Sequence, residues 1–196
     1  MAKAHKSSED TKTLKVKFVD EGEFRNQTSN LRNMIFSDTH TLFNSELYSA
    51  EQLQQSEVNR ARFDKLESLY CLLMLDEECI GWHFGFQYGP LSYYMCNSAI
   101  VPEHQRNGYY TFLAQQVMSE AHRRGYLKIT SRHHPTNTAV LIAKLKLGFI
   151  VSGMQLSANF GTLLELEWNA SSKVNDVMKV RCGALKPDAG AIHSAM

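Results

Sequence analysis

The 196-residue chain lacks an excess of charge of either sign, with 21 Lys and Arg against 20 Asp and Glu and a net charge of +1. Proteins that coat nucleic acids or bind membrane surfaces carry a clear basic excess, so neither partner is expected. The chain also lacks an apolar run approaching the ~20 residues that cross a bilayer, and its first residues lack the apolar centre of a signal peptide. These absences indicate a cytoplasmic protein.

The chain lacks metal-ligand patterns as well. No two of its four cysteines have C-x-x-C spacing. They lie mostly in apolar, strand-like runs and are interpreted as small buried residues in a reducing compartment; they are Cys71, Cys79, Cys96 and Cys182. Adjacent histidines such as His133 and His134 point apart on an extended chain. No metal site is therefore expected.

What is present is an ordinary globular composition, 43% apolar and 21% charged, enough for one sizeable core. We expect a flexible N-terminus over residues 1–12, a single domain over 13–170 and a partly flexible C-terminal extension over 171–196. Apolar periodicity predicts a strand, then helices over 21–69 interrupted by a loop at Phe36–Ser49, then three antiparallel-type strands, and finally the order helix, strand, helix, strand, strand. The fold class is therefore mixed α/β.

The strand written "CIGWHFGFQYG" has two unlike faces. Trp82, Phe84 and Phe86 share one face, which we expect to pack under a helix. On the other face, glycines alternate with His83 and Gln87. Because glycine has no side chain, this face predicts that a helix or a ligand approaches the strand closely.

The segment "VPEHQRNGYYTFL" runs from a strand end at Val101 through a polar loop into a helix that begins near Tyr109. The first N–H groups of a helix have no acceptors inside the helix, and with the positive helix end they form an anion site suited to a diphosphate. Gly108 permits close main-chain approach there. Taken alone, the segment is interpreted as an ordinary loop, because a single glycine is weak evidence for a phosphate site.

Val101, Gln105 and Gly108 match the first motif of the GNAT acyl-CoA-dependent N-acetyltransferases, and Asn137 with Gly148-Phe149 resembles the second. The resemblance extends over roughly Leu14 to Trp168. It implies a GNAT-type fold: a largely antiparallel central sheet with two splayed parallel central strands and helices on both faces. It also implies acetyl-CoA as co-substrate.

The resemblance assigns the coenzyme-binding residues. The loop and the helix start would hold the diphosphate through main-chain N–H groups; they are Gln105, Arg106, Asn107, Gly108, Tyr109, Tyr110 and Thr111. The strand Ala99, Ile100 and Val101 would pair with the pantetheine arm, and one N–H there would face the thioester oxygen. Asn137 would contact the coenzyme near the pantetheine. Tyr110 departs from the family pattern, which has a second Gly or Ala at that position.

A second departure concerns catalysis, because Lys144 stands where the family often has a tyrosine that protonates the leaving thiolate. Lys144 is either a proton donor or a solvated residue beside Lys146. His83 is either a general base or a core histidine. Tyr94 and Ser131 are further catalytic candidates, and Asn97 and Ser98 are placed to order a water molecule.

The sequence thus predicts an N-acetyltransferase that moves an acetyl group from acetyl-CoA to a primary amine of a small molecule or peptide by direct attack. The loop Phe36–Ser49 would select this acceptor, and a homodimer is possible. The alternatives are a non-catalytic acyl-CoA-binding or regulatory module of the same fold, or a structural protein in which the glycine loop is only a turn.

Overall fold

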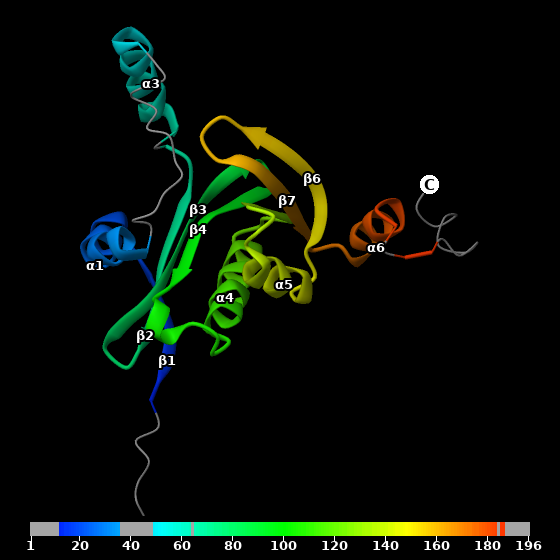
Figure 1. The fold of residues 1–196 in the computed structure, drawn as a ribbon, viewed down its shortest axis with the longest axis horizontal. Helices are drawn as coiled ribbons and strands as arrows, with labels where there is room; N and C mark the ends of the chain where they lie inside the picture. The colour runs from blue at the N-terminus through cyan, green and yellow to red at the C-terminus, as the bar shows by residue number, and fades with distance from the viewer. Residues whose placement is uncertain (1–11, 36–48, 64, 184, 187–196) are drawn as a thin grey trace, which may run out of the picture.

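The structure, a computed structural model, describes residues 12–35, 49–63, 65–183 and 185–186 (Figure 1). The predicted loop at 36–49 lies outside the described residues except for its last position. The described elements, in chain order, are β1 (Leu14–Val19), α1 (Glu21–Ile35), α3 (Ala50–Phe63), β2 (Ser68–Leu75), β3 (Glu78–Gly89), β4 (Ser92–Ile100), η1 (Pro102–His104), α4 (Tyr109–Arg123), β5 (Lys128–His133), α5 (Thr138–Lys146), β6 (Ile150–Ser157), β7 (Gly161–Asn169) and α6 (Ser172–Arg181).

The strands of the described chain form one seven-stranded sheet in the order β1-β2-β3-β4-β5-β7-β6. Its neighbours are antiparallel except for β4 and β5, which are parallel and pair only from Ser92 with Lys128 to Tyr94 with Thr130. Beyond these pairs the two strands diverge, although β4 continues to Ile100. The predicted mixed sheet with two splayed central strands is confirmed.

Helices cover both faces of the sheet, α1 on one side and α4 with α5 on the other (Figure 1). Phe24 of α1 packs with Trp82 of β3 and Leu72 of β2, as the aromatic face of β3 predicts. On the opposite face, Leu113 and Val117 of α4 are almost completely buried against the sheet. This second cluster, on the face covered by α4, is the larger hydrophobic core of the described chain.

The glycine face of β3 lies on the side of the sheet that α4 covers, and the closest approach to the glycines comes from side chains of the neighbouring strand β4. A Cβ atom at Gly85 would lie 2.2 Å from the hydroxyl of Tyr93, and one at Gly81 would lie 2.7 Å from Cδ1 of Ile100. The glycines therefore make room for large side chains of β4 to lie across β3.

Glycines end two of the helices, and polar side chains cap the starts of others. Gly125 and Gly148 follow α4 and α5 with φ of +94° and +89°. The cap of α5 is Asn137, whose side chain accepts a hydrogen bond from the N–H of Val140. The sequence also failed to predict α6, which lies in the C-terminal extension. No helix in the described part of the chain is long and apolar enough to cross a membrane.

Candidate active site

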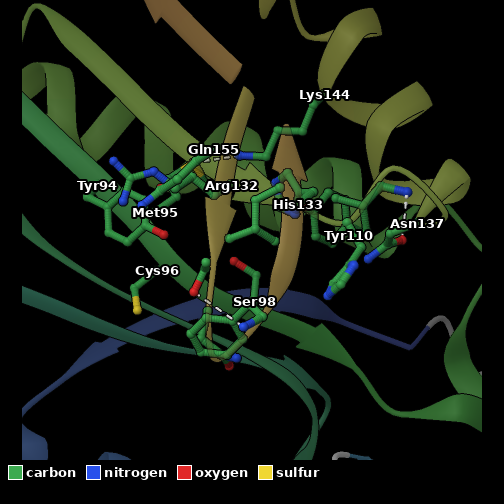
Figure 2. Close-up of a pocket in the computed structure, with 16 residues that line it drawn as sticks. Tyr94, Met95, Cys96, Ser98, Tyr110, Arg132, His133, Asn137, Lys144 and Gln155 are labelled. Carbon is green, nitrogen blue, oxygen red and sulfur yellow. Dashed lines mark hydrogen bonds between the residues drawn. The ribbon is translucent and has the colours of Figure 1, made fainter. Parts of the chain in front are cut away.

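A cavity of about 530 Å³ occupies the gap where β4 and β5 diverge (Figure 2). Its walls come from β4, β5, the first turn of α4, α5 and the β6–β7 hairpin. Figure 2 shows Tyr94 and Arg132 toward one end, Tyr110 and Asn137 toward the other, and Lys144 between them in this view. Six of the sequence-predicted site residues line this cavity: Tyr94, Asn97, Ser98, Tyr110, Asn137 and Lys144.

A β-bulge shapes the β4 wall. Met95 pairs with Gly85 and Asn97 pairs with Phe84, so Cys96 is an extra residue without a partner on β3. Cys96 is exposed and lines the cavity. The interpretation of the cysteines as buried residues is correct for Cys71 but wrong for Cys96 and for Cys182.

The end of β4 presents its main chain to the gap. Ala99, Ile100 and Val101 are buried, and the N–H of Val101 donates to the carbonyl of Ile80 on β3. Because main-chain groups of successive strand residues point to opposite sides, the N–H of Ile100 points toward the gap. The carbonyl of Ile100 accepts from Nε2 of Gln105 at 3.0 Å, which ties the loop to the strand.

The loop after β4 leaves the start of α4 open. Gly108 is the N-cap with a φ of +79°, and among the described residues no side chain caps this helix. By contrast, Ser171 caps α6. A Cβ at Gly108 would meet nothing within 4 Å. The N–H groups of Tyr109, Tyr110 and Thr111 therefore face open space, as an anion cradle requires.

Two residues beside Gly108 fix the loop. Arg106 is exposed with a φ of +65°, and the side chain of Asn107 donates to the carbonyl of His104 at 3.3 Å. The bulky Tyr110 does not fill the open space at the helix start, because its side chain packs against the core and lines the cavity. Burial raises the pKa of Tyr110, so its hydroxyl stays protonated.

Lys144 is completely buried in the cavity wall, and its interpretation as a solvated residue is wrong. Its Nζ lies 2.8 Å from Sδ of Met95 and 4.2 Å from the centroid of the Phe149 ring. Burial lowers the pKa of Lys144 from 10.5 to about 7. Its neighbour Lys146 is exposed.

The other catalytic candidates lie differently. His83 and Ser131 are completely buried and are not among the residues that line the cavity. His83 is connected to the cavity by a hydrogen bond to Ser98, which lines it. Oγ of Ser131 lies 3.1 Å from Nε2 of His133, another residue of the cavity wall. Tyr94 stacks with the guanidinium of Arg132 at 5.4 Å, and Arg132 is paired with Glu165 on β7.

The model of the acetyltransferase (GNAT) family matches residues 34–149, more than half of the chain. The chain belongs to the GNAT family. The resemblance drawn from Val101, Gln105 and Gly108 is thereby confirmed. A search of curated protein sequences found no match.

Solved structures with the GNAT fold cover most of the chain. One is yncA from Salmonella typhimurium, assigned as an acetyltransferase and solved with its cofactor acetyl-CoA, with a TM-score of 0.60, 14% identity and coverage of 81% of this chain and 95% of that one. An N-acetyltransferase from Staphylococcus aureus has a TM-score of 0.58 and 12% identity over 81% and 99% of the chains. A ribosomal-protein-alanine N-acetyltransferase from Brucella melitensis has a TM-score of 0.56 and 17% identity over 79% and 98%. At these identities the likeness shows the fold alone.

Several residues of this GNAT cavity were missed by sequence reasoning. Met95 looks like any core residue of β4, and Gln155, Ser157 and Phe160 belong to a hairpin that is distant in sequence from both motifs. The sequence indicated these hairpin residues only through the apolar alternation of the last two strands. That pattern predicts a hairpin but does not indicate where its tip lies. Only the pairing of β7 with β5 brings that tip to the cavity.

Proposed function

We propose that the protein transfers an acetyl group from acetyl-CoA to a primary amine of a small molecule or peptide, by direct attack in a ternary complex. The observation that carries this proposal is the cavity between β4 and β5, which has the uncapped start of α4 on its border and the buried Lys144 in its wall. Membership of the GNAT family and the acetyl-CoA in the yncA structure support the choice of acyl donor.

The residues present fit an acyl-CoA. The N–H groups of Tyr109–Thr111 and the open space at Gly108 suit the diphosphate. The N–H of Ile100, which points toward the gap, suits an amide of the pantetheine arm. Asn137 lines the cavity, although its Oδ1 already accepts from Val140, so its amide nitrogen is the group that would meet the coenzyme.

Lys144 is the proposed general acid. When the C–S bond of the thioester breaks, the electron pair goes to sulfur, and the ammonium of Lys144 supplies the proton. A thiol has a pKa of about 8.5, whereas burial brings the pKa of Lys144 to about 7. Proton transfer is therefore downhill, and it also removes a positive charge from a buried position.

The attacking amine must be neutral, since an ordinary alkylammonium with a pKa of about 10 is not nucleophilic. Burial, with a smaller contribution from the charge of Lys144, lowers the pKa of His133 in the wall to about 4, so this imidazole is a weak base. We therefore infer that the neutral fraction of the amine enters the cavity. The value of kcat/KM for the amine should then rise with pH up to about 7 and level off above it, because loss of the Lys144 proton offsets the gain in neutral amine.

The alternative of a non-catalytic acyl-CoA-binding module rested on the missing tyrosine. A buried amine in the cavity wall at that same position weakens the alternative, because it offers an acid of suitable pKa. The two functions differ in turnover and not in coenzyme binding.

The first test is the melting temperature with and without millimolar acetyl-CoA. A ligand at 100 times its Kd stabilises the folded state by about 2.7 kcal/mol, which corresponds to a rise of several degrees. No shift would overturn the proposal. Release of free thiol is then measured with small amines and with short peptides, since one relative is named for a protein alanine acceptor. Binding without acetylated product would identify the non-catalytic module.

Location in the cytoplasm and formation of a homodimer also belong to this proposal. The edge strand β6 exposes Met154 and Leu156, with 75% and 82% of their surface accessible, which supports contact with a second copy there. Sedimentation equilibrium of the intact chain and of Leu156→Glu tests the dimer, which the substitution should dissociate.

A further inference from the structure

Three side chains form a continuous hydrogen-bonded path from the core to the cavity. His83 is 0% exposed, and its Nδ1 lies 2.7 Å from Oγ of Ser98 while its Nε2 lies 2.7 Å from the hydroxyl of Tyr93. Tyr93 is buried among core residues, and Ser98 is half-buried and lines the cavity. His83 and Ser98 are direct partners across β3 and β4.

The direction of these hydrogen bonds follows from what each group can donate. Burial, with a smaller contribution from Lys144, lowers the pKa of His83 well below 6.5, so the ring is neutral and has one donor and one acceptor. Burial raises the pKa of Tyr93, which therefore keeps its proton. Among the described residues, the hydroxyl of Tyr93 has no hydrogen-bond partner other than Nε2 of His83.

A buried hydroxyl hydrogen without an acceptor is strongly unfavourable. Tyr93 must therefore donate to Nε2, which leaves the ring hydrogen on Nδ1. That N–H donates to Oγ of Ser98. Ser98 thus accepts a hydrogen bond from His83 through one lone pair of Oγ. No other group in the described chain accepts the hydroxyl hydrogen of Ser98. This hydrogen is therefore directed to the cavity, which Ser98 lines.

We propose that Ser98 is an oriented hydrogen-bond donor to the carbonyl oxygen of the bound thioester, with His83 and Tyr93 as positioning residues. This inference rests on the proposed function. When the amine nitrogen bonds to the carbonyl carbon, the electron pair of the C=O double bond moves to oxygen, and the O–H of Ser98 stabilises that charge without transferring its proton. The electron pair on oxygen then re-forms the C=O bond, the C–S bond breaks, and the thiolate takes the proton of Lys144. The extra proton on the new amide nitrogen is lost to solvent, and Lys144 is reprotonated from solvent.

The arrangement along β4 favours the carbonyl oxygen as the recipient. Lys144, the donor proposed for sulfur, contacts Met95, which lies on the same face of β4 as Ser98. The sulfur and the oxygen of a thioester are attached to one carbon, so two donors on one face of one strand suit them. Successive donation from Tyr93 through His83 also polarises the hydroxyl of Ser98 and strengthens its hydrogen bond.

This role differs from that of a general base. A base at His83 would need its lone pair on Nδ1, with Ser98 donating to the ring. The tautomer of His83 therefore separates the two roles, and long-range ¹H–¹⁵N correlation spectra of the free protein measure it, with the signal identified by its loss in His83→Asn. We expect a neutral ring with hydrogen on Nδ1. Hydrogen on Nε2, or an imidazolium, would overturn the proposal.

Kinetics with saturating acetyl-CoA provide the second test. Ser98→Ala should lower kcat about 100-fold, as expected for removal of an oxyanion donor, while the Kd of acetyl-CoA stays within twofold. Ser98→Thr keeps the hydroxyl and should recover kcat to within tenfold of the unaltered protein. His83→Asn keeps an N–H near the position of Nδ1 and should retain more kcat than His83→Leu, provided both are stabilised by acetyl-CoA.

The outcomes separate the two proposals. If the unaltered protein turns over acetyl-CoA and Ser98→Ala keeps kcat within about threefold, the role of Ser98 is overturned and the acetyltransferase proposal stands. If the unaltered protein does not bind acetyl-CoA, both are overturned.

Discussion

The amine of Lys144 on α5 lies 2.8 Å from the thioether sulfur of Met95 on β4, and both residues line the cavity. A thioether is a weak acceptor, and the ring of Phe149 at 4.2 Å adds only a modest cation–π attraction. Neither replaces the hydration that an ammonium loses on burial. The pKa of Lys144 falls to about 7 for this reason, and several predictions depend on it.

The first prediction concerns stability. The pKa of Lys144 is about 7 in the folded state against 10.5 for the ordinary group, so the unfolded chain binds this proton more tightly. Lys144 therefore destabilises the folded state increasingly as pH falls from about 10.5 to 7. Lys144→Met should raise the free energy of unfolding by up to about 4–5 kcal/mol below pH 7, with the gain vanishing near pH 10. Urea denaturation at pH 6, 8 and 10 measures it.

The exposed Lys146 on the same helix is the control. Lys146→Met should change stability by less than about 0.5 kcal/mol at every pH. A gain for Lys144→Met that is independent of pH would contradict a depressed pKa at Lys144.

The second prediction concerns the pH dependence of kcat. Only protonated Lys144 donates to the thiolate, so kcat should decline above a pH of about 7. Lys144→Tyr substitutes a phenol with a pKa of about 10 and should move this decline upward by two units or more. Rates with saturating substrates from pH 5.5 to 10 provide the comparison. If kcat of Lys144→Met declines above the same pH as kcat of the unaltered protein, the decline belongs to the titration of another group.

The third prediction compares two glycines at opposite ends of α4. Gly108 and Gly125 have φ of +79° and +94°, and a Cβ at either would meet nothing within 4 Å. Alanine at either position should therefore lower stability by a similar amount, about 1–2 kcal/mol. Only Gly108→Ala should weaken acetyl-CoA binding, by fivefold or more in calorimetric titrations, because its methyl group enters the space assigned to the diphosphate. Equal affinities of Gly108→Ala and Gly125→Ala for acetyl-CoA would contradict a diphosphate site at the start of α4.

The fourth prediction uses two exposed cysteines. Cys96 lines the cavity at the bulge of β4, whereas Cys182 follows α6. Bound acetyl-CoA should slow alkylation of Cys96 by iodoacetamide at least tenfold and leave Cys182 unaffected, as followed by mass spectrometry of peptides. Equal protection of both residues, or of neither, would place the ligand elsewhere.

Local patterns were sufficient for the elements and the coenzyme loop. The segment after Val101 predicted a helix that begins near Tyr109, where α4 begins, and Gln105 and Gly108 predicted its open start. These features depend on neighbours within a few residues. The burial of Lys144 does not: the apolar stripe of α5 runs through Val140, Ala143 and Leu147, and only the packing of α5 beside β4 buries the lysine.

The path through His83 was hidden for a related reason. Phe86 pairs with Tyr94 and Gly85 with Met95, and a regular continuation of this register would place Asn97 opposite His83. The bulge at Cys96 shifts the register by one residue, so that Ser98 lies opposite His83 instead. A one-residue shift of this kind leaves no mark on apolar alternation.

The short pairing of β4 with β5 has a consequence for how the domain opens. Only three residue pairs join the half of the sheet formed by β1–β4 to the half formed by β5–β7. The amide of Ile100 and its neighbours along the gap should exchange with deuterium through a partial opening that leaves each half folded. An acyl donor that spans the gap would close this route, and the two halves would then unfold as one cooperative unit.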